Sequence, residues 1–180
     1  LDEITVSTGL LELNRYPLFS NMDFNGDISK WDTSRIVSMN RVFQGSSFTG
    51  DISDWDVSNA KSMASMFENS AFTGDISRWD TSCVHIMDRL FKNSSFAGDI
   101  SDWNVSNTKS MVSMFEGSVF NGDLSTWNMR GVAYLEDMFK DSRFVGNISQ
   151  WRLQEAVQCG GMFLGSPFAG DLSSWQLPHW

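Results

Sequence analysis

One phrase recurs through this chain at a constant interval of 24 residues, without insertion or deletion. It reads Phe-x-Gly-[Asp/Asn]-[Ile/Leu]-Ser-x-Trp and opens at Phe24, Phe48, Phe72, Phe96, Phe120, Phe144 and Phe168. A constant period of this length is typical of chains that stack similar coils, each contacting only its neighbours. We therefore expect a solenoid. Its predicted parts are an N-terminal cap with a degenerate half repeat at 1–23, six full repeats at 24–167, and a truncated seventh repeat or C-terminal cap at 168–180.

Two hydrophobic patterns lie within each repeat when the opening Phe is numbered position 1. Positions 5, 8 and 10, as in Ile52, Trp55 and Val57, follow the spacing of a leucine-rich-repeat strand. Positions 13, 16, 19 and 20, which include Met87 and Phe91, suit one face of a short helix. Gly, Asn or Asp at position 22 tolerates the left-handed conformation that ends a helix. The sequence thus predicts an α/β solenoid with one short strand and one short helix in each coil.

The repeat resembles a known family. The phrase Asp51-Ile52-Ser53-Asp54-Trp55-Asp56-Val57-Ser58-Asn59, followed by Ser65-Met66-Phe67 and Ser70-Ala71-Phe72, carries the resemblance. It is similar to the bacterial surface protein (BspA-like) repeats of Mycoplasma lipoproteins, which are related to leucine-rich repeats, in the form common in marine algae and other protists. The resemblance spans about residues 16–177. It implies a right-handed, leucine-rich-repeat-like coil with no established activity, used for surface attachment and protein recognition.

A column of tryptophans occupies position 8. Because position 8 faces inward on the predicted strand, we expect these side chains to lie in the core, beside Ile and Val. The alternative is that they form an exposed platform on which sugars stack. The members are Trp31, Trp55, Trp79, Trp103, Trp127, Trp151 and Trp175.

A column of carboxylates occupies position 4. Stacked like charges repel unless they accept hydrogen bonds or share a cation. Calcium binding is therefore one interpretation, and the other, which we favour, is that each Asp accepts a turn N–H. The members are Asp27, Asp51, Asp75, Asp99, Asp123 and Asp171.

Three sets of residues are candidates for binding a partner. Position 7 alternates in sign along the predicted strand face, which favours a cross-strand ion-pair ladder: Lys30, Asp54, Arg78 and Asp102. Position 9 beside it is acidic in the first three repeats: Asp32, Asp56 and Asp80. A third set departs from the repeat pattern near the C-terminus: Arg130, Tyr134, Arg143 and Arg152. These residues are either a specific contact patch or the result of ordinary sequence drift toward a terminal cap.

Composition excludes several classes of function. The chain has 13 Lys and Arg against 22 Asp and Glu, a formal net charge of -9, which argues against a nucleic-acid partner and an anionic membrane surface. No apolar run reaches the ~18–20 residues of a membrane span. With two Cys and two His, no Cys/His metal cluster can form. We expect no cofactor, no metal and no catalytic residue.

These observations predict a non-enzymatic module that presents a rigid repeat surface to another protein, at the cell surface or secreted. A carbohydrate ligand is a weaker alternative. The second hypothesis is a structural or scaffold subunit of a large multiprotein complex, associated with an organelle of an alga or protist. Because the chain begins at Leu1, we expect a processed protein or a piece of a longer one.

Overall fold

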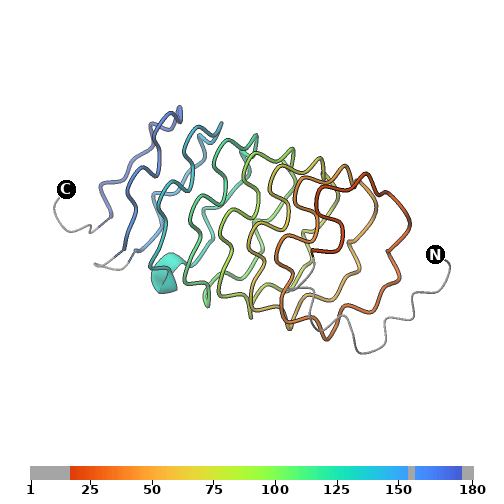
Figure 1. Cartoon of the computed structure of the whole chain (residues 1–180). Helices are drawn as coiled ribbons and strands as arrows, with labels where there is room; N and C mark the ends of the chain where they lie inside the picture. Colours follow the sequence, from red (N-terminus) through yellow and green to blue (C-terminus); the bar gives the residue numbers. More distant parts are fainter. Residues whose placement is uncertain (1–16, 154–156, 176–180) are drawn as a thin grey trace.

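The computed structural model describes residues 17–153 and 157–175. Its trace forms successive coils stacked along one axis, from the red N-terminal end to the blue C-terminal end (Figure 1). Parallel β-bridges join residues 24 apart, from Ser38 to Ser62 and onward to Gln158, so each repeat makes one coil.

Parts of both predicted caps lie outside the described residues: 1–16 at the N-terminus and 176–180 at the C-terminus.

The predicted α/β solenoid, with a leucine-rich-repeat-like strand and helix in each coil, is wrong. The described residues contain one helix, the 3-10 helix η2 (Met129–Gly131), and no extended strand, only five isolated bridges. The coils are instead built almost entirely from turns. Two ladders of hydrogen bonds explain how such coils remain regular.

Positions 16–22, which include the second half of the predicted helix and its stop, form the main ladder between coils. In the first five repeats the amides of positions 16, 18, 20 and 22 donate to carbonyls of the next coil over 2.7–3.0 Å, as from Met39 to Ser62 and from Phe43 to Met66. The amides of positions 19 and 21 donate to the carbonyl three residues earlier in the same coil. Consecutive backbone groups therefore bond alternately between coils and within a coil, which leaves them paired without a helix.

Left-handed residues make this alternation possible. Position 18 has a positive φ in each coil, including Arg41 at 60° and Arg89 at 54°. Position 22 also has a positive φ, as in Asn69 at 55° and Gly117 at 64°. A right-handed helix cannot contain such residues, so position 22 is left-handed as predicted but ends a turn rather than a helix.

The segment predicted as a strand consists of turns closed by side chains. Asp51 accepts the amide of Ser53 over 2.9 Å, and Asp56 accepts the amide of Ser58 over 2.9 Å. These Asx turns bend the chain at positions 4–6 and again at 9–11. The apolar positions 5, 8 and 10 still point inward, because the turns bury the same side chains that a strand would.

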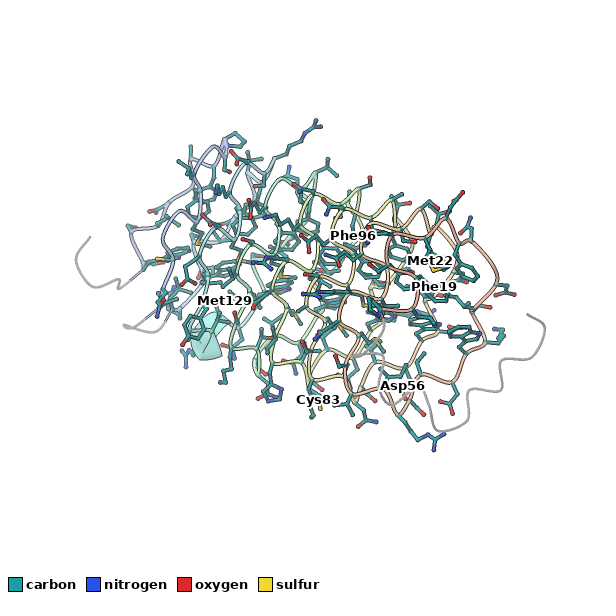
Figure 2. All side chains as sticks on the ribbon, in the orientation of Figure 1. Phe19, Met22, Asp56, Cys83, Phe96 and Met129 are labelled. Carbon is teal, nitrogen blue, oxygen red and sulfur yellow. The ribbon has the colours of Figure 1, made fainter. Side chains whose placement is uncertain are left out.

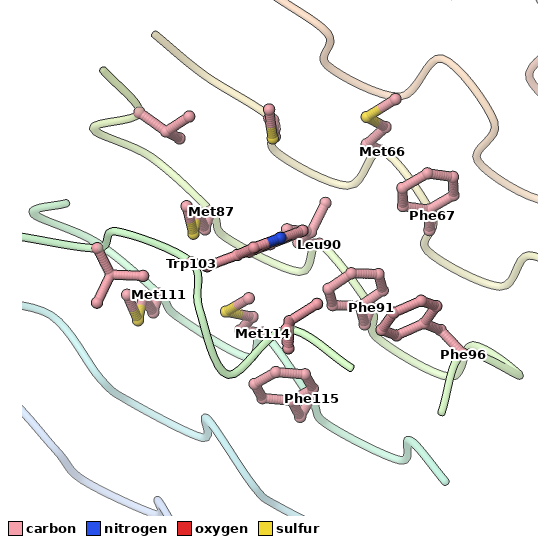
Figure 3. Packing of buried hydrophobic residues seen from close by; sticks show 14 of the residues in the cluster. Met66, Phe67, Met87, Leu90, Phe91, Phe96, Trp103, Met111, Met114 and Phe115 are labelled. Carbon is pink, nitrogen blue, oxygen red and sulfur yellow. The ribbon is translucent and has the colours of Figure 1, made fainter. Parts of the chain in front are cut away.

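The core is a set of columns parallel to the stack axis (Figure 3). Phenylalanine rings at position 20, such as Phe91 and Phe115, stack with centroids 5.7 Å apart, and each also contacts the next opening Phe, as Phe91 contacts Phe96 at 4.4 Å. Methionines such as Met87 and Met111 fill a second column and are fully buried. Because the columns continue from coil to coil, the hydrophobic stabilisation of each coil comes from its neighbours.

Candidate interaction surface

The position-7 residues form a partial ion-pair ladder on an exposed face. Lys30 and Arg78 flank Asp54, with N···O distances of 3.8 and 3.4 Å. Among the described residues, no ion pair joins Arg78 to Asp102. All the paired side chains are largely exposed to water, so this ladder adds little stability.

The position-9 carboxylates have a local structural role. Asp32, Asp56 and Asp80 are exposed, and each accepts the amide two residues ahead, over 3.1, 2.9 and 3.0 Å. Hydrogen bonds from the Ser34 and Ser82 hydroxyls, and then from the amides of the same serines, lower the pKa of Asp32 and Asp80. Sequence reasoning treated this column only as a charged face and missed its turns. The Asp-x-Ser spacing was the available signal.

The position-4 carboxylates form the same kind of turn. Each accepts the amide of the Ser two residues ahead over 2.8–2.9 Å, and that backbone bond is the main cause of the lowered pKa throughout the column. Asn147, which replaces Asp in the sixth repeat, accepts the amide of Ser149 over 3.0 Å. Within the described residues, no group of three or more His, Cys, Asp or Glu could hold a metal ion. This geometry supports the turn interpretation over the calcium interpretation.

The C-terminal candidates are divided among different parts of the coil. Arg130 lies in η2 and lines a hollow of about 310 Å³ together with Arg152. The Arg152 guanidinium donates to nearby carbonyls, including that of Trp151 over 3.3 Å. Tyr134 lies in the row of β-bridges, and the amide of Arg143 donates to Ser118, just before the opening Phe144. Among the described residues, no hydrogen bond or ion pair joins Arg143 to Arg130, Tyr134 or Arg152.

The tryptophan column lies within the stack. Trp55, Trp79, Trp103, Trp127, Trp151 and Trp175 are buried, and Trp31 in the first coil is partly buried. Each buried indole N–H donates to the carbonyl of a position-5 residue in the preceding coil, as Trp103 does to Ile76 over 3.0 Å. An indole held in this way presents no ring face to a sugar.

The bridge row is a partly exposed feature that the sequence did not reveal. We use this name for Ser38, Ser62, Ile86, Ser110, Tyr134 and Gln158. Ile86 and Tyr134 are 39% and 43% exposed, and Val37, directly before the row, is 47% exposed. Lys61 and Lys109 occupy the position of Val37, directly before the row, in the second and fourth coils and are also exposed. Exposed nonpolar and basic side chains therefore lie together on and beside the row.

A groove lies next to the bridge row. It has a volume of about 500 Å³, and its walls include Arg41 and Arg89 from alternate coils, with the small residues Ala64 and Ser65 between them. The groove also contains Asp88, whose carboxylate accepts the Ser110 hydroxyl and the Val112 amide. The two arginines were not identified from the sequence, because a side chain on a left-handed residue has no distinctive pattern.

Figure 2 shows how these side chains are distributed around the coil. Asp56, Cys83 and Met129 lie along one edge of the stack, whereas Phe19, Met22 and Phe96 lie nearer the opposite edge. Cys83 is a free cysteine with intermediate exposure, and His85 is exposed. Within the described residues, no hydrogen bond joins Cys83 to His85, and no side chain there orients either one as nucleophilic catalysis requires.

Comparison with known proteins places the repeat in a family. The family model described as "Mycoplasma protein of unknown function, DUF285" matches residues 15–95 and 68–175. The chain belongs to this family. The match agrees with the Mycoplasma-type repeat that the sequence resembles. The relation of this family to leucine-rich repeats and the algal form of the repeat stay predictions.

No curated protein and no solved structure matches the chain. Within the described residues, no helix has the length and apolar character needed to cross a membrane.

Proposed function

We propose that this member of the DUF285 family is a non-enzymatic recognition module that binds another protein through the bridge row and the adjoining arginine groove. The observation that carries this proposal is the exposure of Ile86 and Tyr134 on one rigid row and of Val37 directly beside it. Exposed nonpolar patches bordered by polar residues are characteristic of protein-binding sites.

The backbone behind the row is held on both sides. The amide of Lys61 donates to Val37 in the preceding coil over 2.7 Å, and the amide of Met63 donates to Ile86 in the next coil over 3.0 Å. A surface fixed in this way loses little conformational entropy when a partner binds, which favours affinity.

The charge of the surface defines the kind of partner. Arg41, Lys61, Arg89 and Lys109 are exposed around the row and groove, although the chain as a whole carries a net charge of -9. We expect a partner with acidic side chains around a nonpolar centre, because opposite charges at the edge of an interface speed association and select among partners.

The resemblance to bacterial surface proteins supports a location at the cell surface or in the secreted fraction. The alternative is a structural subunit of a large complex. Native mass of the protein purified gently from its source separates the two, because a subunit would elute as a stoichiometric complex that resists salt.

The proposed surface is tested with two matched variants. Ile86→Asp places a carboxylate in the bridge row, and Val119→Asp places one at an equally exposed site elsewhere, since the side chains are 39% and 38% exposed. Wild type and both variants are immobilised at equal density, and proteins bound from a native extract are quantified by mass spectrometry. A partner retained by wild type and Val119→Asp but lost by Ile86→Asp supports the proposal. Equal retention by all three proteins contradicts it.

A further inference from the structure

The arginine groove contains two guanidinium groups that are not engaged in ion pairs. Arg41 and Arg89 occupy position 18 of the first and third repeats and line the same hollow of about 500 Å³. Both are exposed, and neither guanidinium makes a hydrogen bond or an ion pair within the described residues. Two coil spacings of ~4.8 Å place their backbones roughly 10 Å apart. An anion in the groove would therefore have a cation on each side.

Asn40 adds amide hydrogens to the same groove. Its Oδ1 accepts the Ala64 amide over 2.9 Å and the Ser62 hydroxyl over 2.6 Å. Because a backbone N–H can only donate, the side-chain atom that faces Ala64 must be the oxygen. The orientation of the side chain is thereby fixed, and its Nδ2 group has no acceptor in the described part of the chain.

Ser65 supplies a hydroxyl from the coil between the two arginines. The residue lines the groove although it is only 5% exposed, and its backbone amide and carbonyl both make hydrogen bonds. Its hydroxyl makes none within the described residues. A nearly buried hydroxyl without a partner is costly, so a ligand in the groove that accepts from it gains affinity.

Asp88 is the counterpart of Asn40 two coils later, and its charge opposes anion binding. Its carboxylate accepts a hydroxyl and a backbone amide of the next coil, from Ser110 and Val112, just as the Asn40 oxygen does. The two side chains therefore share one structural role and differ in charge. A bound anion would lie nearer to Asn40 than to Asp88.

We propose that this groove binds a phosphoryl group on a side chain of the protein partner, an inference that rests on the proposed function. Its donors come from three successive coils: Asn40 and Arg41, then Ser65, then Arg89. A carboxylate has two oxygens in one plane. A phosphoryl group has three oxygens that point in different directions and a charge of about −2 at pH 7, so it can accept from all three coils at once.

The site is tested first without a partner. The full chain is titrated with phosphoserine and with glutamate, each as its N-acetyl amide, at constant ionic strength. The chemical shifts of the Ala64 and Ser65 amides, measured by NMR, report binding. We expect the phosphoserine compound to bind at least about tenfold more tightly than the glutamate compound. Equal binding of the two compounds, or no binding of phosphoserine, overturns the proposal.

Two exchanges of nearly equal shape should shift the affinity in opposite directions. Asn40→Asp adds a negative charge to the site and should raise the dissociation constant of the phosphoserine compound about tenfold. Asp88→Asn removes such a charge and should lower it by a similar factor. Both variants should keep their fold, because each new residue makes the required hydrogen bonds at the other site. Thermal denaturation checks this, and unchanged affinity in both folded variants contradicts the site.

The contribution of the arginines is tested with a matched pair. Arg41→Gln should raise the dissociation constant of the phosphoserine compound about tenfold, because it removes a charged donor. Arg78→Gln should leave it unchanged, since this arginine lies on the position-7 face, where its side chain is 71% exposed. Equal effects of the two variants would indicate attraction by overall charge and would overturn the site.

Phosphatase treatment of the native extract separates this inference from the proposed function. A partner that is lost by Ile86→Asp and also lost after phosphatase treatment supports both. A partner that is lost by Ile86→Asp but retained after phosphatase treatment supports the bridge row and overturns the phosphoryl site. Phosphoserine binding in the groove, with no partner that Ile86→Asp loses, supports the phosphoryl site and contradicts the bridge row as the protein contact.

Discussion

Trp79 shows how one side chain connects three coils. Its indole N–H donates to the carbonyl of Ile52 in the preceding coil over 3.2 Å, and its ring stacks on Trp103 in the following coil with centroids 6.3 Å apart. The side chain is 4% exposed. At the scale of a residue, a position in this molecule is therefore defined by contacts 24 residues away in both directions.

Replacing Trp79 by Ala should lower the free energy of unfolding by about 3–5 kcal/mol, because it empties a buried site of this size. Trp79→Phe keeps a ring but leaves the buried Ile52 carbonyl without its donor, which should cost about 1–3 kcal/mol. Urea denaturation followed by tryptophan fluorescence measures both values. A Trp79→Ala protein with wild-type stability would show that the column is a surface platform.

The position-4 carboxylates should make the stability of the fold depend on pH. Each has a folded-state pKa below its ordinary value, because the charged form accepts an amide hydrogen bond. Such groups stabilise the fold above their unfolded pKa of about 4, and this stabilisation is lost as the pH falls through the folded pKa.

Changing all six to Asn tests this effect, since Asn147 makes the same turn without a charge. We expect the variant to keep its fold at neutral pH and to lose stability less steeply than wild type below pH ~4. Urea midpoints measured across the acid range compare the two proteins. Parallel pH curves would contradict the expectation and assign the acid sensitivity to other groups.

At the scale of the element, the unit of this fold is a run of turns with two left-handed residues, four positions apart, in each coil. Gly117, with φ 64°, is one such residue. Gly117→Ala should lower the free energy of unfolding by about 1–2 kcal/mol, because a side chain disfavours the left-handed conformation and its Cβ would crowd the Asn93 amide oxygen. Thermal denaturation measures the effect.

Two further variants serve as controls. Gly117→Asn reproduces the residue found at the equivalent sites Asn69 and Asn93, so it should be tolerated. Gly160→Ala should have almost no effect, since a Cβ there meets nothing within 4 Å. If Gly117→Ala and Gly160→Ala lowered stability equally, the left-handed backbone would not be the cause.

The sequence predicted which side chains are buried better than it predicted the backbone that buries them. The spacing of positions 16, 19 and 20 fits a helix, yet Met39, Val42 and Phe43 are buried by successive turns. Two structures can share this pattern because a turn with an i to i−3 bond and a helix both return the chain to one face every three or four residues. The deciding position is 18, where Arg41 and Ser65 carry no sign of their left-handed conformation.

The candidate surface was predictable only in part. Arg78 and Asp54 pair as their alternating charges indicated. The bridge row was missed because its members, such as Ser62 and Ile86, share a position but no chemical character. Only the register of the coils shows that these dissimilar side chains lie in one line.

At the scale of the whole molecule, long regular order occurs without long regular elements. We expect a far-ultraviolet circular dichroism spectrum that lacks the paired minima of α-helices, because η2 is the only helix in the described residues. Unfolding monitored by tryptophan fluorescence serves as the control that the protein is folded. A strongly helical spectrum from the folded protein would contradict this structure.

The direction of the main ladder has a mechanical consequence. Its bonds run from each coil to the next, as from Phe67 to Leu90 and from Phe91 to Met114, so they lie along the stack rather than across it. A force that pulls the two ends apart acts along these bonds. It should separate one coil from the stack before it separates the next. The chain would therefore lengthen in steps of one repeat under tension, with the remaining coils still folded.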